Sequence, residues 1–148
     1  MIRATSAIHS HGSVIDSVTL TYDARFRRRI VMTSDRGMEF LLDLPKVTDL
    51  KHGDCLVLED GRLIEIAAAD EPLLKITGDD PQHLTRLTWH IGNRHLPCQI
   101  EADHILIAPD PVIADMVRHL GGTIAEITQP FTPEGGAYGH GRTHSHEH

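Results

Sequence analysis

Hydrophobic and polar positions alternate over short runs in the first half of the chain, which is the period of a half-buried β-strand. The clearest runs are aliphatic and β-branched: SVTLTYD (17–23), RRIVMTS (28–34) and MEFLLDL (38–44). The turn residues 35–37 between the last two runs predict a hairpin. A second hairpin is predicted within residues 55–69, where Asp60-Gly61 suits a type I′ turn. We therefore expect residues 1–70 to form an all-β domain.

The hydrophobic period changes to that of amphipathic helices in two later segments. One helix is predicted to begin at Pro81 behind Asp79 or Asp80, and another at Pro111 behind Asp110, since aspartate caps helices and proline suits their first position. Gly92-Asn93 and Gly121 are expected to end them. Their apolar stripes are Leu84, Leu87 and Ile91 in the first helix, and Ile113, Met116, Val117 and Leu120 in the second.

Strands are predicted on both sides of each helix, at residues 73–77, 97–103, 104–109 and 122–128. The order strand, helix, strand, strand, helix, strand is that of the ferredoxin-like (βαββαβ) fold. We therefore expect residues 71–130 to form an α+β domain with both helices on one face of an antiparallel sheet. The other face is expected to be open to a partner.

The end of the chain is rich in Gly, Pro and His and has few apolar side chains, so we expect residues 131–148 to form a disordered, flexible tail. It carries His140, His144, His146 and His148. Imidazoles on alternate residues of an extended chain point the same way about 7 Å apart. They suit Ni, Cu, Zn or Fe ions, and binding displaces their protons. The alternatives are a purification tag and a solvated tail without a function.

A second candidate site lies in WHIGNRHLPCQI (89–100), where His95 follows the predicted helix end. This position places its side chain at a surface corner. One imidazole cannot hold a metal ion tightly, because such sites use three or four donors. A two-fold axis beside His95 would bring two copies together, and the tails would complete the coordination shell. Without other information, a structural role for His95 is the alternative.

Composition excludes several function classes. The formal net charge is −7, and the only basic cluster, Arg25 with Arg27, Arg28 and Arg29, is typical of a solvated strand face, so nucleic-acid binding is not expected. No apolar run approaches a membrane span or a secretory signal. Two distant cysteines indicate no disulfide framework, so we expect a cytoplasmic protein. The enzyme motifs His-Glu-x-x-His and Cys-x-x-Cys are both absent from the sequence.

Three segments together resemble the urease accessory protein UreE family of nickel metallochaperones: HIGNRHLPCQIEAD (90–103), the LEDGRLIEIAAADEPLLKITG that precedes it, and the histidine-rich end. The resemblance covers essentially the whole chain. It implies a β domain likened to peptide-binding modules, a ferredoxin-like metal-binding domain and a homodimer. It also implies that His95 binds nickel at the dimer interface, with the tail histidines as further ligands. Nickel would pass to apo-urease through a GTPase partner.

The resemblance has one limit. Some relatives carry extra metal-binding histidines ahead of the second helix, whereas this chain has APDP (108–111), so no auxiliary site is expected there. Cys98 is expected to be a buried strand residue, and His9 with His11 a solvated terminus.

The sequence therefore predicts a non-enzymatic carrier of Ni(II). Copper and zinc would also bind in vitro, since affinity alone does not select nickel. A nickel storage protein, a peptide-binding chaperone with incidental metal binding, and a metalloenzyme are the alternatives.

Overall fold

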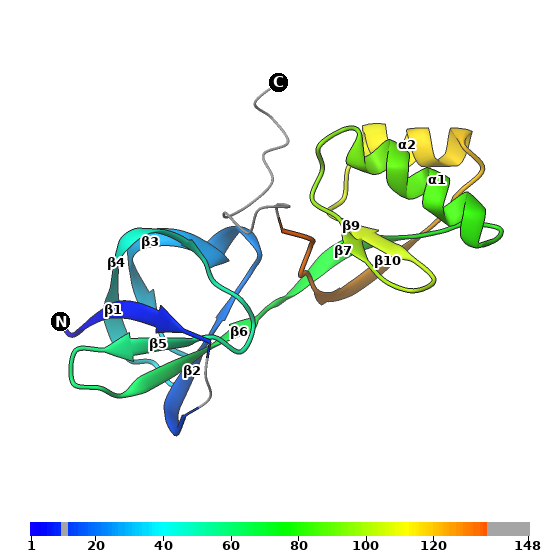
Figure 1. Cartoon of the computed structure of the whole chain (residues 1–148). Helices are drawn as coiled ribbons and strands as arrows, with labels where there is room; N and C mark the ends of the chain where they lie inside the picture. Colours follow the sequence, from blue (N-terminus) through cyan, green and yellow to red (C-terminus); the bar gives the residue numbers. More distant parts are fainter. Residues whose placement is uncertain (10–11, 136–148) are drawn as a thin grey trace. The chain divides into compact units, whose positions relative to one another are not determined.

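The structure, a computed structural model, describes residues 1–9 and 12–135 of the chain (Figure 1). The chain divides into two compact units, Met1–Ala69 and Asp70 onward. The predicted division at residue 70 therefore lies within one residue of the observed one. No helix in the described part of the chain has the length and apolar character needed to cross a membrane.

The first unit is a six-stranded sheet with the strand order β2-β6-β5-β1-β4-β3. Two of its pairs, β1 with β4 and β2 with β6, are parallel, and the others are antiparallel. Alternate side chains of the strands form one core, in which Phe40, Leu42, Leu56, Ile64 and Ile66 are fully buried. The strands are β1 (Arg3–Ile8), β2 (Val14–Leu20), β3 (Phe26–Thr33), β4 (Glu39–Asp49), β5 (Cys55–Leu58) and β6 (Leu63–Ala68).

Both hairpins form where the sequence predicts them, β3 with β4 and β5 with β6. The predicted type I′ turn at Asp60-Gly61 is wrong, because that turn needs a positive φ at both residues. Among the described residues only His95 combines a side chain with a positive φ, so Asp60 does not qualify. The chain instead turns through three residues and closes at Gly61, whose φ is 87° and whose N–H donates to Leu58 O at 2.8 Å.

The second unit is a four-stranded antiparallel sheet with the order β10-β7-β9-β8, and both helices lie on the same face of it (Figure 1). Leu74, Ile76, Ile105 and Ile107 face these helices and form the core with their apolar stripes. The elements are β7 (Asp70–Thr77), α1 (Pro81–Gly92), β8 (Gln99–Ile100), β9 (Ile105–Ile107), α2 (Pro111–His119) and β10 (Thr123–Pro130).

The helix ends follow the capping rules. Asp80 rather than Asp79 caps α1, where its Oδ1 accepts a hydrogen bond from His83 N at 2.7 Å. Asp110 caps α2 in the same way, and Gly121 follows that helix with a φ of 83°. The predicted stripe of α2 is one residue too long, because the helix ends at His119 and Leu120 is exposed.

Residues 131–134 form a segment that we call the strap, and it passes from one edge of the second sheet to the other. It starts at the end of β10, the strand at one edge. At the opposite edge, Thr132 N donates to the side-chain oxygen of Gln99 at 2.8 Å, and Glu134 N donates to Cys98 O at 2.9 Å. Phe131 and Pro133 are buried, and Phe131 is only 2 % exposed.

The face opposite the helices contains buried residues. Leu106 pairs with Lys75 and not with a core residue of β7, so its side chain points away from the helices, yet it is fully buried. Leu73 is two residues before Lys75 in β7, so its side chain lies on the same face as that of Leu106, and it is also buried. The expectation that this face is open is therefore wrong at Leu73 and Leu106. The predicted tail boundary at residue 131 also differs, because residues 131–134 belong to the fold.

Candidate metal site

The corner that carries His95 is built by the end of α1. Ile91, in the last turn of that helix, is fully buried and fixes the helix to the sheet. Three successive backbone hydrogen bonds then close the chain into a tight turn: Asn93 N to Trp89 O (2.9 Å), Arg94 N to Ile91 O (3.1 Å) and His95 N to Gly92 O (3.0 Å). All four residues from Gly92 to His95 are exposed, and His95 is at the end of this turn.

His95 has a left-handed backbone conformation, with a φ of 59°. Glycine is the residue usually found there, because a Cβ atom makes this conformation unfavourable by about 1–2 kcal/mol. Helix ends are common places for such a residue. The sequence indicated Gly92-Asn93 as the breaking point, but α1 continues to Gly92 and the left-handed residue comes three positions later. Strained residues that carry a side chain concentrate at functional sites, which makes His95 a candidate.

The chain after His95 returns to the core at once. Leu96 packs against the core of the second unit, and Cys98 is part of that core with 9 % exposure. Burial raises the pKa of the Cys98 thiol, and the nearby charge of Glu134 raises it further. A neutral buried thiol is a poor metal ligand, so Cys98 is a structural residue here. Ile100, two residues later in β8, is 48 % exposed.

The strap brings the end of the described chain to the same corner. Glu134 bonds to Cys98, which is three residues after His95. Three residues span at most about 11 Å between Cα atoms. The predicted tail ligands His140, His144, His146 and His148 lie outside the described residues.

Within residues 1–9 and 12–135, no three His, Cys, Asp or Glu side chains gather closely enough to hold a metal ion. Several histidines of this part have structural partners instead. The ring of His83 accepts a hydrogen bond from Asp79 N at 2.8 Å, so its other nitrogen donates to Leu120 O, also at 2.8 Å. It joins the start of α1 to the end of α2. Both of its nitrogens are occupied, a role that sequence analysis missed.

Three further histidines lie beside acidic side chains or helix carbonyls. His104 Nδ1 is 2.6 Å from Asp103 Oδ1, and this hydrogen bond lowers the pKa of the Asp103 carboxyl group. His119 Nδ1 lies 3.2 Å from the carbonyl oxygen of Asp115, one turn earlier in α2. In the first unit, His9 is largely exposed, and its Nδ1 is 2.7 Å from the buried carboxylate of Asp54. His11 lies outside the described residues.

An apolar groove of about 430 Å³ runs between α1 and β8. Trp89 and Ile100 line it on its two sides and are 64 % and 48 % exposed. The Trp89 ring meets the ring of His90 edge-on, with centroids 5.0 Å apart. Large exposed apolar side chains of this kind mark interaction surfaces. Trp89 is two turns before His95 in the chain, so this groove adjoins the corner.

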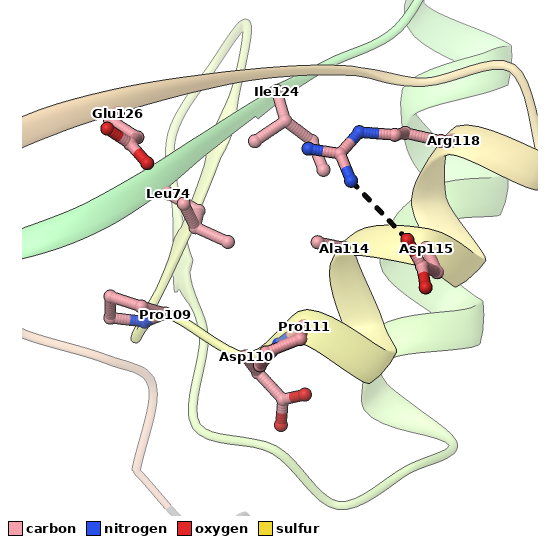
Figure 2. Close-up of a pocket in the computed structure, with 9 residues that line it drawn as sticks. All are labelled: Leu74, Pro109, Asp110, Pro111, Ala114, Asp115, Arg118, Ile124 and Glu126. Carbon is pink, nitrogen blue, oxygen red and sulfur yellow. Dashed lines mark hydrogen bonds and ion pairs between the residues drawn. The ribbon is translucent and has the colours of Figure 1, made fainter.

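Another hollow of the second unit, about 480 Å³, lies between α2 and the edge strand β10 (Figure 2). Leu74, Ala114 and Ile124 give it an apolar floor, and the ion pair of Arg118 with Asp115 (3.4 Å) lies beside it. None of its lining residues is a histidine or cysteine, so its chemistry does not suit nickel.

Comparison with known proteins decides the family. The UreE urease accessory protein N-terminal domain matches residues 1–69, and the C-terminal domain of the same family matches residues 71–148. The chain belongs to the UreE family. The urease accessory protein UreE of Ruegeria pomeroyi is 59 % identical over 90 % of this chain and 87 % of the relative. That of Chelativorans sp. (strain BNC1) is 54 % identical over 99 % of this chain and 91 % of the relative.

A third UreE, from Rhodopseudomonas palustris (strain HaA2), is 59 % identical over 93 % of this chain but only 66 % of its own length. UreE proteins of this group therefore differ in how much chain they have beyond the shared part. The resemblance inferred from the residues of the Gly-Asn-Arg-His corner is confirmed, and the two family domains meet where the structure divides the chain.

Proposed function

We propose that this UreE family member is a nickel metallochaperone. It binds Ni(II) between the two subunits of a homodimer and delivers it for assembly of the urease active site. The observation that carries this proposal is the geometry of His95, an exposed histidine in a strained conformation at a rigid corner. The second copy of this imidazole and the tail histidines of both chains are the further ligands.

The dimer contact is proposed to include the groove between α1 and β8. Trp89 and Ile100 are exposed there, and burying an indole ring against a second copy removes a large apolar area from water. An isologous contact places the same residues of both copies around one axis. A His95 close to this axis then faces its own copy, and one nickel ion joins the two subunits.

The tail is proposed to supply the remaining ligands. His140 is only six residues after Glu134, which is held at the corner. A flexible chain of this length has a root-mean-square reach of about 13 Å. This reach is sufficient to bring a tail imidazole to residue 95. The later histidines at 144, 146 and 148 have longer reaches and exchange with it.

Transfer requires a site that releases its ion. A buried four-ligand site holds a structural metal tightly, whereas an exposed site completed by tail histidines gives up its ligands one at a time. Affinity does not choose nickel, because Cu(II) binds the same donors more tightly, so Zn(II) and Cu(II) also bind in vitro. Selection is proposed to come from geometry and from the protein partners.

The proposed partners are the urease apoprotein complex and the urease accessory GTPase, in the cytoplasm, with neither nucleic acid nor membrane as a partner. The second unit is proposed to be a ferredoxin-like domain, since its element order is βαββαβ and its fourth strand lies beside its first. Within the predicted tail, residues 131–148, the part after the strap is proposed to act as the ligand-bearing segment. The protein is proposed to have no catalytic activity.

The direct test is nickel calorimetry of the full-length protein and of His95→Ala. The proposal expects the variant to lose the tight site while the dimer persists in sedimentation. An unchanged stoichiometry and affinity in His95→Ala would show that the anchor is elsewhere. Retention of nickel in the presence of the apo-urease complex and the GTPase would favour storage, and urease activation by residues 1–70 alone would favour a peptide-binding chaperone.

A further inference from the structure

We infer that the strap, residues 131–134, is a positioning device that sets nickel affinity without touching the metal. This inference rests on the proposed function of His95 and the tail. Phe131 and Pro133 are buried, and the hydrogen bonds to Gln99 and Cys98 fix the end of the strap at the β8 edge. The tail thus starts beside the corner of His95 and not at the end of β10.

The strap matters because β10 lies at one edge of the sheet, whereas residue 95 precedes β8 at the opposite edge. β10 and β8 are the two edge strands, with β7 and β9 between them. Three strand spacings separate these edges, which is about 14 Å. A tail that left the fold directly at Pro130 would have to span this width before it reached residue 95. The four residues of the strap cover that distance in a fixed conformation.

Releasing the strap changes two quantities that govern an intramolecular contact. The stretch of chain between the last fixed residue and His140 grows from six residues, counted from Glu134, to ten, counted from Pro130. Its starting point also moves away by the width of the sheet. For a flexible chain, these changes together lower the effective concentration of the first tail imidazole at residue 95 about fourfold. Nickel affinity falls by this factor for each tail that supplies a ligand, while the number of ions bound at saturation is unchanged.

The strap can be released by removing its two hydrogen bonds. Glu134→Pro removes the N–H that donates to Cys98, and Gln99→Met removes the side-chain oxygen that accepts from Thr132. The matched control combines Glu134→Ala with Gln99→Glu, which changes the same positions but keeps a donor and an acceptor. Phe131→Ser is a second, independent release variant, because this ring is the most buried part of the strap.

Nickel affinity is measured by calorimetry for each full-length protein and for the same variants cut after residue 135. We expect both release variants to bind nickel about fourfold more weakly than the control where one tail supplies a ligand, and about sixteenfold more weakly where both tails do. In the shortened proteins, this difference should disappear, because no tail remains to be positioned. Faster amide hydrogen exchange at residues 131–134 reports the release itself, and thermal unfolding shows that the second unit remains folded.

Equal nickel affinity of the released and control proteins would overturn the inference. An equally large loss in the shortened proteins would also overturn it, since the strap would then act only on the fold. Both results are distinct from failure of the proposed function, in which His95→Ala and removal of the tail would themselves leave nickel affinity unchanged.

Discussion

The left-handed conformation of His95 allows its backbone role and its metal role to be tested separately. We consider three variants, His95→Ala, His95→Asn and His95→Gly, all of which lack the imidazole. A residue with a Cβ atom is disfavoured at a φ of 59° by about 1–2 kcal/mol. Glycine avoids this cost, but it also makes the unfolded chain more flexible. This second effect lowers the gain in stability by about 0.4–1 kcal/mol.

The difference leaves His95→Gly more stable than His95→Ala by about 1 kcal/mol, with His95→Asn between them, because asparagine tolerates left-handed conformations. For a domain of this size, that corresponds to about 4–8 °C in the melting temperature. The comparison between variants without an imidazole removes any contribution from the side-chain contacts of His95. Nickel affinity should fall equally in all three, since none retains the proposed anchor.

The assays are thermal unfolding of the metal-free proteins and nickel calorimetry at neutral pH. If His95→Ala were as stable as His95→Gly, residue 95 would not be left-handed and the description of the corner would be wrong. If His95→Gly kept the nickel affinity of the native protein, the description of the corner would remain correct, but the proposed metal role of His95 would be wrong.

Three further predictions concern other parts of the molecule. Trp89 is the only tryptophan, so its emission should move to shorter wavelength as the dimer forms, and Trp89→Ala should weaken the dimer; unchanged sedimentation of the variant would contradict this. Cys98→Ala should leave nickel stoichiometry unchanged in calorimetry, because the thiol is buried and its pKa is raised; loss of an ion would refute it. A hydrogen bond from Ser34 lowers the pKa of Asp16. The stability that this bond gives to the ionised carboxylate is present above about pH 4 and is lost on acidification. Urea unfolding of Ser34→Ala should therefore show a larger loss of stability at pH 7 than near pH 2, where only the hydrogen bond from Met38 N to Ser34 is still missing.

Most of the fold could be predicted from hydrophobic periods and caps. The strand runs, both helix starts and the end of the second helix follow from local residues such as Asp110, Pro111 and Gly121, whose preferences act within a few positions. The N-terminal strand β1 was missed, because RATSAI is weakly hydrophobic and depends on pairing with β4 and β5 for its structure. Such tertiary pairing leaves no local period.

Only part of the candidate site could be predicted from the sequence, for similar reasons. The surface corner of His95 follows from the helix end, but the left-handed residue does not, since Gly92 and Asn93 are better local candidates. The strap was predicted to be disordered from its Pro and Gly neighbours. The sequence did contain a signal that Phe131 is buried. This residue continues the alternation of β10 on the face of Ile127, and an aromatic ring in a polar segment is expected to be buried.

The central claim is that His95 of both subunits anchors one nickel ion. The most direct measurement is nickel-edge anomalous diffraction from crystals of the nickel-loaded, full-length protein. The account predicts a single strong peak on the two-fold axis, bound by an imidazole nitrogen of residue 95 from each copy. A peak elsewhere, with His95 uncoordinated in both subunits, would contradict it.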